Sequence, residues 1–439
     1  MHEASLLNGE WVQSQSGNRL DVEDPGSAQI WASCPANEVA DVDQYVETFH
    51  AAFEKYRRVN PRERAKILLK WHELVTNARE DIAKIVVYET GNPMLEAVDE
   101  VDYALGFAWW FAGEAERIPL AARCSINIKP SPETPLSVMA LADLALRARL
   151  PAGVLNVIST DNANTPLVSE RLCKHPLVRK VTFTGSTTVG SIVARHCSDG
   201  LKKVTMELGG NCPLIIFDDG DLDQAVAALM ILKWRTAGQA CTHANRVYMQ
   251  SGVDDKFAQM MLESTQKIRV GHGAERGTTM GPLTTSRGVQ KIKQHVADAV
   301  SKGEQILCGG KQLDHWKGFF FEPTIISNIE EIFGPLLGLY KFETEEEVVK
   351  KANDTPMGLA AYFFTRDVSQ TWRLLEGLEA GMIGMNTGNA SCAESPFGGM
   401  KMLGYGKEAG KDVAIEEYLV QKTGTLTVED TKCDEAETI

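Results

Sequence analysis

Hydrophobic residues recur at helical spacing through the first third of the chain. One run predicts a helix across residues 42–56, because its apolar residues share one face: Val42, Tyr45, Val46, Phe49, Phe53 and Tyr56. Asn60 and Pro61 then offer a cap and a first-turn proline for a second helix. A third helix is predicted from about Pro93 to about Ile118. Its aromatic residues favour the core over a ligand site: Trp109, Trp110 and Phe111.

From Ser125 onward, short apolar runs alternate with helical ones. Four runs are typical of strands, at residues 126–128, 154–158, 178–183 and 214–217. Helices are predicted between and after them, at residues 134–150, 187–197 and 222–237. Because strands that alternate with helices are typical of a parallel, doubly wound sheet, the sequence predicts an α/β fold.

The end of the chain has a different pattern. Residues 418–428 alternate threonine with apolar residues, which predicts an edge strand that pairs with another subunit. Residues 429–439 are polar and acidic, and we expect them to form a flexible tail.

Composition narrows the range of partners. The 439 residues carry a net charge of −14, which argues against nucleic acid and anionic membranes because both favour a basic patch. The nine cysteines are dispersed and lack metal-ligand spacing, so we expect reduced thiols and no metal. No apolar stretch is long enough to span a bilayer, and the N-terminus does not resemble a targeting segment. A cytoplasmic protein is expected.

Phe183-Thr184-Gly185-Ser186 lies between a predicted strand and a predicted helix. A strand–glycine–helix junction presents free backbone N–H groups and a helix dipole, which can hold a phosphate. Simple tight turns have the same composition about as often, so this segment alone does not identify a site.

An acid precedes two glycines in Met206-Glu207-Leu208-Gly209-Gly210-Asn211. The apolar neighbours of Glu207 would raise its pKa and suit it to general-base catalysis. The glycines would let the backbone approach a ligand closely. For an isolated match, a surface acid before a turn is the better interpretation.

Cys241 follows a glycine in Gly238-Gln239-Ala240-Cys241, where a predicted helix ends and a strand-like run begins at Arg246. A lone cysteine is usually a buried structural residue, but a glycine-bounded loop favours a nucleophile. The last segment, Glu331-Ile332-Phe333-Gly334-Pro335, places an acid and an aromatic ring before a turn. It could hold a ribose and a flat ring, or be only a loop.

In this order and with this spacing, the four segments resemble those of the aldehyde dehydrogenase superfamily. The resemblance runs from Leu7-Asn8-Gly9-Glu10-Trp11 to Glu416-Glu417-Tyr418-Leu419 and includes Lys129-Pro130-Ser131, 150–157, 280–283 and 396–399. It implies a Rossmann-type parallel-sheet NAD(P)-binding domain with N-terminal helices at 1–208 and an α/β catalytic domain at 209–408. A C-terminal oligomerisation strand at 409–428 and a tail at 429–439 complete the expected homo-oligomer subunit, in a dimer or tetramer.

The resemblance also implies a reaction, the oxidation of an aldehyde to a carboxylic acid with NAD or NADP. Cys241 would form a thiohemiacetal, hydride transfer would leave a thioester, and Glu207 would activate the water that releases the acid. Lys129 and Glu331 would hold the two riboses, Ser186 the pyrophosphate, and Phe333 the nicotinamide. The same resemblance adds four residues to the cofactor site: Ser131, Phe183, Gly185 and Leu208.

Within the superfamily the chain is most similar to the succinate-semialdehyde dehydrogenases, on residues 183–190, 281–283 and 416–419. A substrate with a distal carboxylate needs an arginine and hydroxyl donors, and Arg235 and Ser391 match residues that family members use there. Alternatively, Arg235 is a cation at a helix C-terminus. Pro132 stands where NAD-specific members often carry an acid, so NADP should be tolerated.

The chain departs from the family pattern between Arg117 and Ser125. Relatives carry a long insert there, with an oligomerisation hairpin, the first strand of the cofactor domain and an asparagine that donates to the thiohemiacetal oxygen. An opening βαβ unit needs roughly 30 residues, so we expect that strand to be missing and a sheet edge to be exposed. Losing one oxyanion donor costs about 3 kcal/mol of transition-state stabilisation. His243 also replaces a cysteine that forms a regulatory disulfide in some members, so that switch is not expected.

Three functions fit these observations: a dehydrogenase for succinic semialdehyde or a related carboxylated aldehyde, an enzyme for another aldehyde in a biosynthetic pathway, or a degenerate, weakly active or inactive chain. The presence of Cys241, Glu207 and Glu331 favours the first two. The missing segment favours the third.

Overall fold

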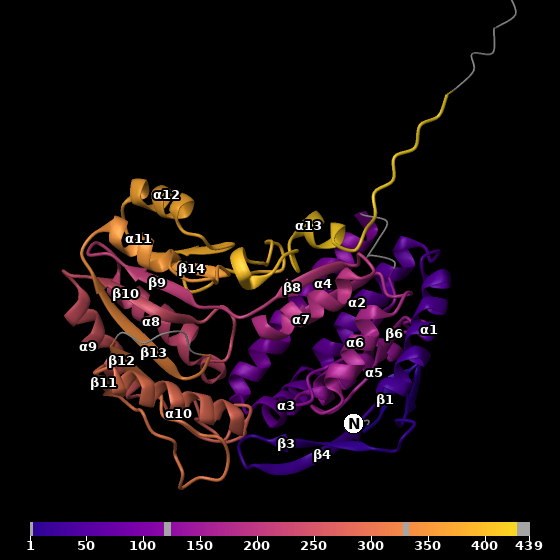
Figure 1. Ribbon diagram of the computed structural model, residues 1–439, viewed down its shortest axis with the longest axis horizontal. Helices are drawn as coiled ribbons and strands as arrows, with labels where there is room; N and C mark the ends of the chain where they lie inside the picture. The colour runs from indigo at the N-terminus through magenta and orange to yellow at the C-terminus, as the bar shows by residue number, and fades with distance from the viewer. Residues whose placement is uncertain (1–2, 118–123, 328–332, 428–439) are drawn as a thin grey trace, which may run out of the picture.

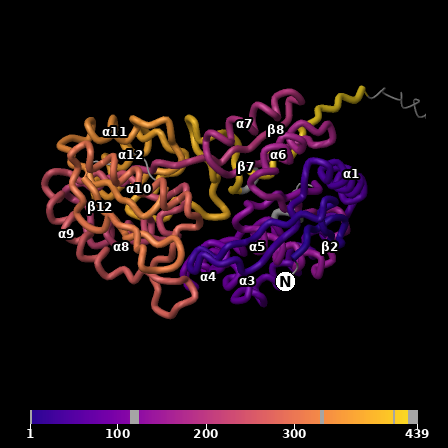
Figure 2. The backbone as a smooth tube through the Cα atoms, turned by 60° about the horizontal axis from the view of Figure 1, so that its bottom comes forward, coloured from indigo at the N-terminus to yellow at the C-terminus, as the bar shows by residue number. Residues whose placement is uncertain are grey.

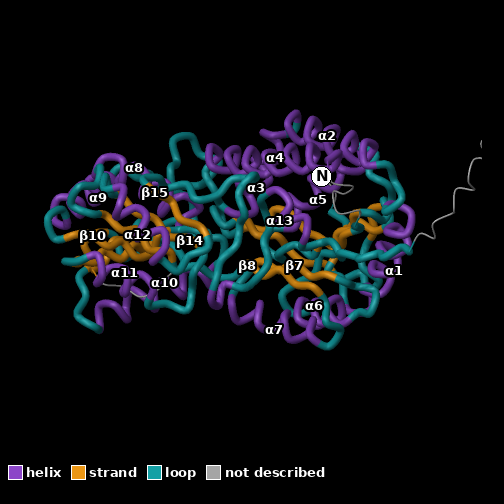
Figure 3. Tube along the Cα trace, turned by 90° about the horizontal axis from the view of Figure 1, so that it is seen from above, coloured by secondary structure: helices purple, strands orange, loops and turns teal. Residues whose placement is uncertain are grey.

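Two lobes, each built around its own β-structure, make up the chain, which the computed structural model describes for residues 3–117, 124–327 and 333–427 (Figure 1). Helices lie outside the strands in both lobes, with α2 and α4 on one side of the first lobe and α6 and α7 on the other (Figure 3). Within the described residues, no helix is long and apolar enough to cross a membrane.

The first lobe contains five helices that the sequence predicted and two that it did not, at residues 79–90 and 165–174. They are α1 (Val39–Tyr56), α2 (Pro61–Asn77), α3 (Arg79–Thr90), α4 (Met94–Arg117), α5 (Pro135–Arg147), α6 (Thr165–Lys174) and α7 (Thr187–Ser198). The cap predicted for α2 is present, since the Asn60 side chain accepts from the Arg62 N–H and Pro61 is the first helical residue. Helix α3 was not predicted as a separate element between α2 and α4. It ends at Gly91, which adopts the left-handed conformation (φ 84°).

The strands of the first lobe are β1 (Ser5–Leu7), β2 (Glu10–Val12), β3 (Arg19–Asp24), β4 (Gln29–Pro35), β5 (Ile126–Ile128), β6 (Leu155–Val157), β7 (Lys180–Thr184) and β8 (Lys203–Glu207). The N-terminal strands β1 to β4 were not predicted, although β3 alternates exposed and buried residues as an edge strand does.

The parallel strands of this lobe form two separate pairs. β5 pairs with β6 in a sheet of order β2-β1-β6-β5, and β7 pairs with β8 alone. A doubly wound sheet has the strand order 3-2-1-4-5, numbered along the chain. Strands β5 and β7 correspond to strands 2 and 4 of that order, so the first strand would lie between them. The described residues contain no strand that joins the two pairs. The expected sheet is therefore divided at its centre, and Ile126 on β5 is 49% exposed.

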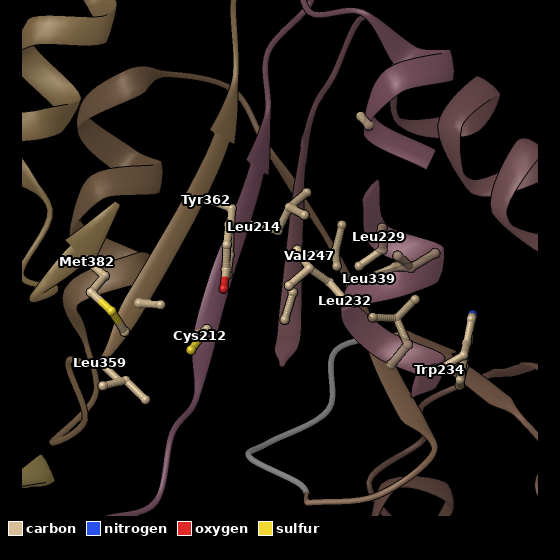
Figure 4. Close-up of a cluster of buried hydrophobic side chains, with 14 of the residues drawn as sticks. Cys212, Leu214, Leu229, Leu232, Trp234, Val247, Leu339, Leu359, Tyr362 and Met382 are labelled. Carbon is tan, nitrogen blue, oxygen red and sulfur yellow. The ribbon is translucent and has the colours of Figure 1, made fainter. Parts of the chain in front are cut away.

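The second lobe has one seven-stranded sheet of order β11-β12-β13-β10-β9-β14-β15, in which only β11 runs antiparallel. Its strands are β9 (Cys212–Ile216), β10 (Ala244–Gln250), β11 (Ile306–Cys308), β12 (Thr324–Ser327), β13 (Leu336–Phe342), β14 (Ala360–Phe364) and β15 (Met382–Met385). Its helices are α8 (Leu222–Trp234), α9 (Asp254–Thr265), α10 (Ser286–Ser301), α11 (Glu345–Asn353) and α12 (Val368–Gly377). The core packs against β9 and β14, whose residues are all buried (Figure 4).

The chain then returns to the first lobe, somewhat before the boundary expected at residue 408 (Figure 2). After the short helix η2 (Lys401–Leu403), Tyr405 accepts a hydrogen bond from Met206 N–H, and Leu403 accepts one from Leu208 N–H. The last helix, α13, spans Lys411–Glu416. Residues 418–427 form no strand within this chain. A strand that pairs with another subunit would take its hydrogen bonds from that subunit, so the oligomerisation strand stays a prediction. The tail at 429–439 lies outside the described residues.

Candidate active site

Glu207 is the last residue of β8, and the parallel register places it opposite Thr184 at the end of β7. Its carbonyl accepts a hydrogen bond from Gly185 N–H at 3.0 Å. The next residue, Leu208, packs against the first turn of α7, where a Cβ on Gly190 would lie 2.3 Å from a Leu208 methyl group. The strand–glycine–helix segment and the acid–glycine segment therefore form one structural unit.

Ser186 caps the N-terminus of α7, and its hydroxyl accepts from Val189 N–H at 3.3 Å. Gly185 lies beneath the ring of Phe183, because a Cβ there would come within 2.5 Å of that ring. Gly185, Ser186 and Val189 are exposed. The positive end of the α7 dipole is thus open to a ligand and fits a phosphate group.

The Glu207 carboxylate is buried, with 2% of the residue exposed. Neither of its oxygens has a hydrogen-bond partner among the residues that the structure describes. Burial, and then the charge of Glu408, raises the pKa of Glu207 to about 8, while Lys407 opposes the shift. A carboxyl group with such a pKa is largely protonated at neutral pH and becomes available as a base as the pH rises through about 8.

Cys241 lies against the glycine loop that follows Glu207. A Cβ on Gly210 would fall 1.9 Å from the Cys241 carbonyl oxygen, and the Cys212 thiol donates to the same oxygen at 3.4 Å. Burial, and then the charge of Glu207, raises the pKa of the Cys241 thiol to about 11, although the N–H groups of Cys241 and Thr242 favour the thiolate. The two residues predicted to be catalytic are therefore electrostatic neighbours.

The fourth segment also reaches this loop. A Cβ on Gly238 would meet the Gly334 carbonyl oxygen at 2.1 Å, so the backbones around these glycines are in direct contact. Phe333 precedes that contact and is 43% exposed. Glu331, the expected ribose ligand, lies outside the described residues.

Lys129 and Ser131 follow the end of β5, as expected for residues at the ligand-binding edge of a parallel sheet. Lys129 Nζ donates to the Pro130 carbonyl at 3.0 Å and to Thr165 Oγ1 at 3.5 Å. The Ser131 hydroxyl donates to Glu133 at 2.5 Å, and Glu133 forms an ion pair with Arg287 at 2.9 Å. Local sequence patterns do not reveal this pair, because Arg287 comes from α10 in the other lobe.

Arg235 and Ser391 both lie near α4, where they interact with different residues of that helix. Burial raises the pKa of Glu100 and raises that of Glu96 to about 7, while the nearby charge of Arg235 opposes both shifts. The Ser391 hydroxyl lies 3.1 Å from the Tyr103 hydroxyl. Glu96, Glu100 and Tyr103 were not predicted as site residues. Their i, i+4, i+7 spacing places them on one face of α4, and that spacing was the available signal.

No group of three or more potential metal-ligating side chains occurs in the part of the chain that the structure describes. The site therefore has the character of a thiol and carboxylate pair next to an open helix N-terminus.

Comparisons with known proteins agree with this geometry. The profile of the "Aldehyde dehydrogenase family" matches residues 11–119 and 118–424, two segments that meet where the sequence departs from the family pattern. Succinate-semialdehyde dehydrogenase [NADP(+)] 1 of Schizosaccharomyces pombe is 41% identical over 477 aligned positions, covering 96% of this chain and 95% of the relative. Because that alignment is longer than the 439-residue chain, the relative has residues that this chain lacks.

Two further relatives agree. A glutarate-semialdehyde dehydrogenase of Pseudomonas putida is 39% identical, covering 97% of this chain and 98% of the relative. The crystal structure of an NADP-dependent enzyme of E. coli superimposes with a TM-score of 0.92 at 38% identity, covering 95% of this chain and 96% of that one. From its sequence, its fold and the placement of its thiol and carboxylate, the chain belongs to the aldehyde dehydrogenase family.

Proposed function

We propose that the chain oxidises a carboxylated aldehyde to the acid with NAD or NADP, using Cys241 as the nucleophile and Glu207 as the general base. One observation carries the proposal: a buried carboxylate without a hydrogen-bond partner among the described residues is the electrostatic neighbour of a partly buried thiol. An isolated structural acid in the core would need partners, because an unpaired buried charge is costly. Glu207 meets that cost through its raised pKa, near 8, which keeps the carboxyl largely protonated at neutral pH and ready to exchange a proton with a transient partner.

The described residues fit a dinucleotide. The open N-terminus of α7 with Ser186 would hold the pyrophosphate, and Lys129 would bind the adenosine ribose. Phe333 would pack against the nicotinamide, beside the nucleophile loop. When bound, the nicotinamide accepts the hydride that leaves the aldehyde carbon.

The pKa values define the proton transfers. The Cys241 thiol, with its pKa near 11, is protonated at neutral pH and must lose its proton to attack a carbonyl. Glu207, with a pKa near 8, is the neighbouring group suited to accept that proton. After the hydride has left, the same carboxylate would take a proton from the water that attacks the thioester. The N–H groups of Cys241 and Thr242 remain available as donors near the sulfur, where relatives add an asparagine.

The proposed substrate class rests on the names of two relatives and on the residues expected to bind its distal carboxylate. Two relatives act, by their names, on succinate semialdehyde and glutarate semialdehyde. Arg235 and Ser391 would bind the distal carboxylate of such a substrate. Glu96 and Glu100 lie close enough to Arg235 to interact with its charge, so we expect binding of the carboxylate to be weaker than an unopposed arginine would give.

Contacts near Lys129 bear on the cofactor. Pro132 removes an acid that would repel a 2′-phosphate. The neighbouring acid, Glu133, is already paired with Arg287 and bonded to Ser131. We therefore expect NADP to be accepted at least as well as NAD.

The test is formation of reduced cofactor by the purified chain. Succinic and glutaric semialdehyde are each offered with NAD and with NADP, and a Cys241→Ala variant is the control. We expect turnover that the variant lacks. No turnover by a soluble, folded chain with either aldehyde would support the alternative of an inactive family member instead.

A further inference from the structure

The backbone just before the nucleophile has an unusual conformation. Thr236, Ala237 and Gly238 are consecutive residues with positive φ values of 49°, 49° and 74°. Only glycine adopts this region freely, so the first two residues are strained. Such strain persists only where the surrounding structure fixes the backbone, and it is typical of functional sites.

Side chains from three other elements fix this loop. Glu96 on α4 accepts from Thr236 N–H at 2.8 Å. On the other side of the nucleophile, the Tyr362 hydroxyl on β14 donates to the Thr242 carbonyl at 3.0 Å. Cys212 on β9 donates to the Cys241 carbonyl at 3.4 Å, and Figure 4 shows Cys212 and Tyr362 on these two strands.

His243 fixes the residue that directly precedes the nucleophile. Ala240 N–H donates to His243 Nδ1 at 3.3 Å, directly before Cys241. His243 is 1% exposed, and its Nε2 has no partner among the described residues. Because Nδ1 accepts a hydrogen bond, the ring must be neutral with its proton on Nε2.

The surroundings of His243 keep it neutral. Burial, then the charge of Lys233 and that of Arg235, lowers the pKa of His243 to about 3, while the Gly238 carbonyl opposes the shift. Lys233 is fully buried and donates to Asn245 Oδ1 at 2.7 Å. Asn245 in turn donates to the Gly210 carbonyl at 3.4 Å, in the loop that separates Glu207 from Cys241.

We propose that His243 is a positioning residue for Cys241, which accepts the Ala240 N–H and thereby orients the Cys241 and Thr242 N–H groups toward the sulfur. Burial of the ring, at 1% exposure, keeps it in its accepting, neutral form, and the charge of the neighbouring Lys233 acts in the same direction. The proposal rests on Cys241 being the nucleophile. It assigns a role to a side chain that stands where some family members have a second cysteine.

Two variants separate the acceptor from the bulk of the ring. His243→Asn places an amide oxygen where Nδ1 lies, and His243→Leu has a similar size without an acceptor. The readout is the rate at which iodoacetamide alkylates Cys241 between pH 6 and about pH 11, followed by peptide mass spectrometry on the full chain, with the exposed Cys392 as the internal standard. This readout requires neither substrate nor cofactor.

We expect the wild type and His243→Asn to react alike. In His243→Leu the thiol pKa should rise by about one unit, so that Cys241 reacts about tenfold more slowly at neutral pH while Cys392 is unchanged. In turnover, kcat should fall by a similar factor with little change in KM.

Equal Cys241 rates in the wild type and His243→Leu would overturn the proposal, as would slow rates in both variants. A faster rate together with a lower melting temperature would show that the ring only fills space. If His243→Leu does not fold, His243→Ala takes its place with the same expectations. A chain without turnover would contradict the proposed function yet leave the alkylation result interpretable.

Discussion

At the scale of single residues, the Glu207 carboxyl and the Cys241 thiol are electrostatic neighbours, because the charge of Glu207 raises the pKa of the thiol. The sequence predicted apolar neighbours for Glu207 and a glycine-bounded loop for Cys241. Their roles stay a proposal. The sequence could not show that Glu96 and Glu100 lie close to Arg235, because α4 and the nucleophile loop are far apart in the chain. Glu331 lies outside the described residues, so its placement is still a prediction.

The elevated pKa of Glu207 predicts opposite effects of pH on activity and stability. Because the base must be ionised, kcat/KM should increase as the pH rises through about 8. The folded-state pKa lies above the unfolded value, so the stability that the protonated form provides is present below about pH 4.5 and is lost as the pH rises through about 8.

Glu207→Gln should therefore lose about 100-fold or more in kcat and unfold at a higher temperature than the wild type at pH 9. At pH 4 the two melting temperatures should be similar. Thermal denaturation at both pH values checks this, and a variant that is less stable than the wild type at pH 9 would contradict the buried, unpartnered carboxylate.

At the scale of elements, local sequence signals predicted where several helices and strands begin and end, but they did not predict which strands pair. Helix α2 begins where Asn60 and Pro61 predicted, and β7, α7 and β9 lie close to their expected positions. Helix α8 ends at Trp234 rather than near Ala237, because Thr236 and Ala237 adopt positive φ. No local sequence signal identifies left-handed residues that tertiary contacts impose. The strands β1 to β4 were missed because short antiparallel strands carry too few residues to establish a period.

The contact between the β8–β9 loop and Cys241 gives a test at this scale. In Gly210→Ala the added Cβ would lie 1.9 Å from the Cys241 carbonyl oxygen, so backbone must move. We expect a loss of about 1–3 kcal/mol in stability and a larger relative loss of kcat. Gly106→Ala is the matched control, because its Cβ on α4 meets nothing within 4 Å. That variant should be neutral or slightly stabilised. Equal behaviour of the two variants in urea denaturation would contradict the close approach.

At the scale of the whole molecule, the sequence predicted the family, the α/β fold and a sheet without its first strand. The family profile matches in two segments that meet at residues 118–119, and the parallel strands of the first lobe form two unconnected pairs. The return of residues 403–405 to the end of β8 could not be predicted, because it depends on contacts between distant segments. The oligomeric state stays a prediction.

The divided sheet predicts uneven stability. β5 has three residues, none of them fully buried, whereas every residue of β9 and β14 is buried. Amides of β5 and β7 should therefore exchange with deuterium much faster than those of β9 and β14, because local opening exposes little apolar surface. Hydrogen exchange with mass spectrometry checks this. Similar protection of all four strands would show that the first lobe is as stable as the second.

The central claim, that Cys241 carries the acyl group and Glu207 releases it, is tested most directly by trapping the intermediate. Glu207→Gln is mixed with NADP and succinic semialdehyde, quenched in acid, and examined by peptide mass spectrometry. We predict one equivalent of reduced cofactor, formed more slowly than in the wild type because the variant lacks the carboxylate that takes the thiol proton. A succinyl thioester on Cys241 should then persist in the variant and not accumulate in the wild type. Reduced cofactor without an adduct on Cys241, or an adduct on another cysteine, would contradict the account.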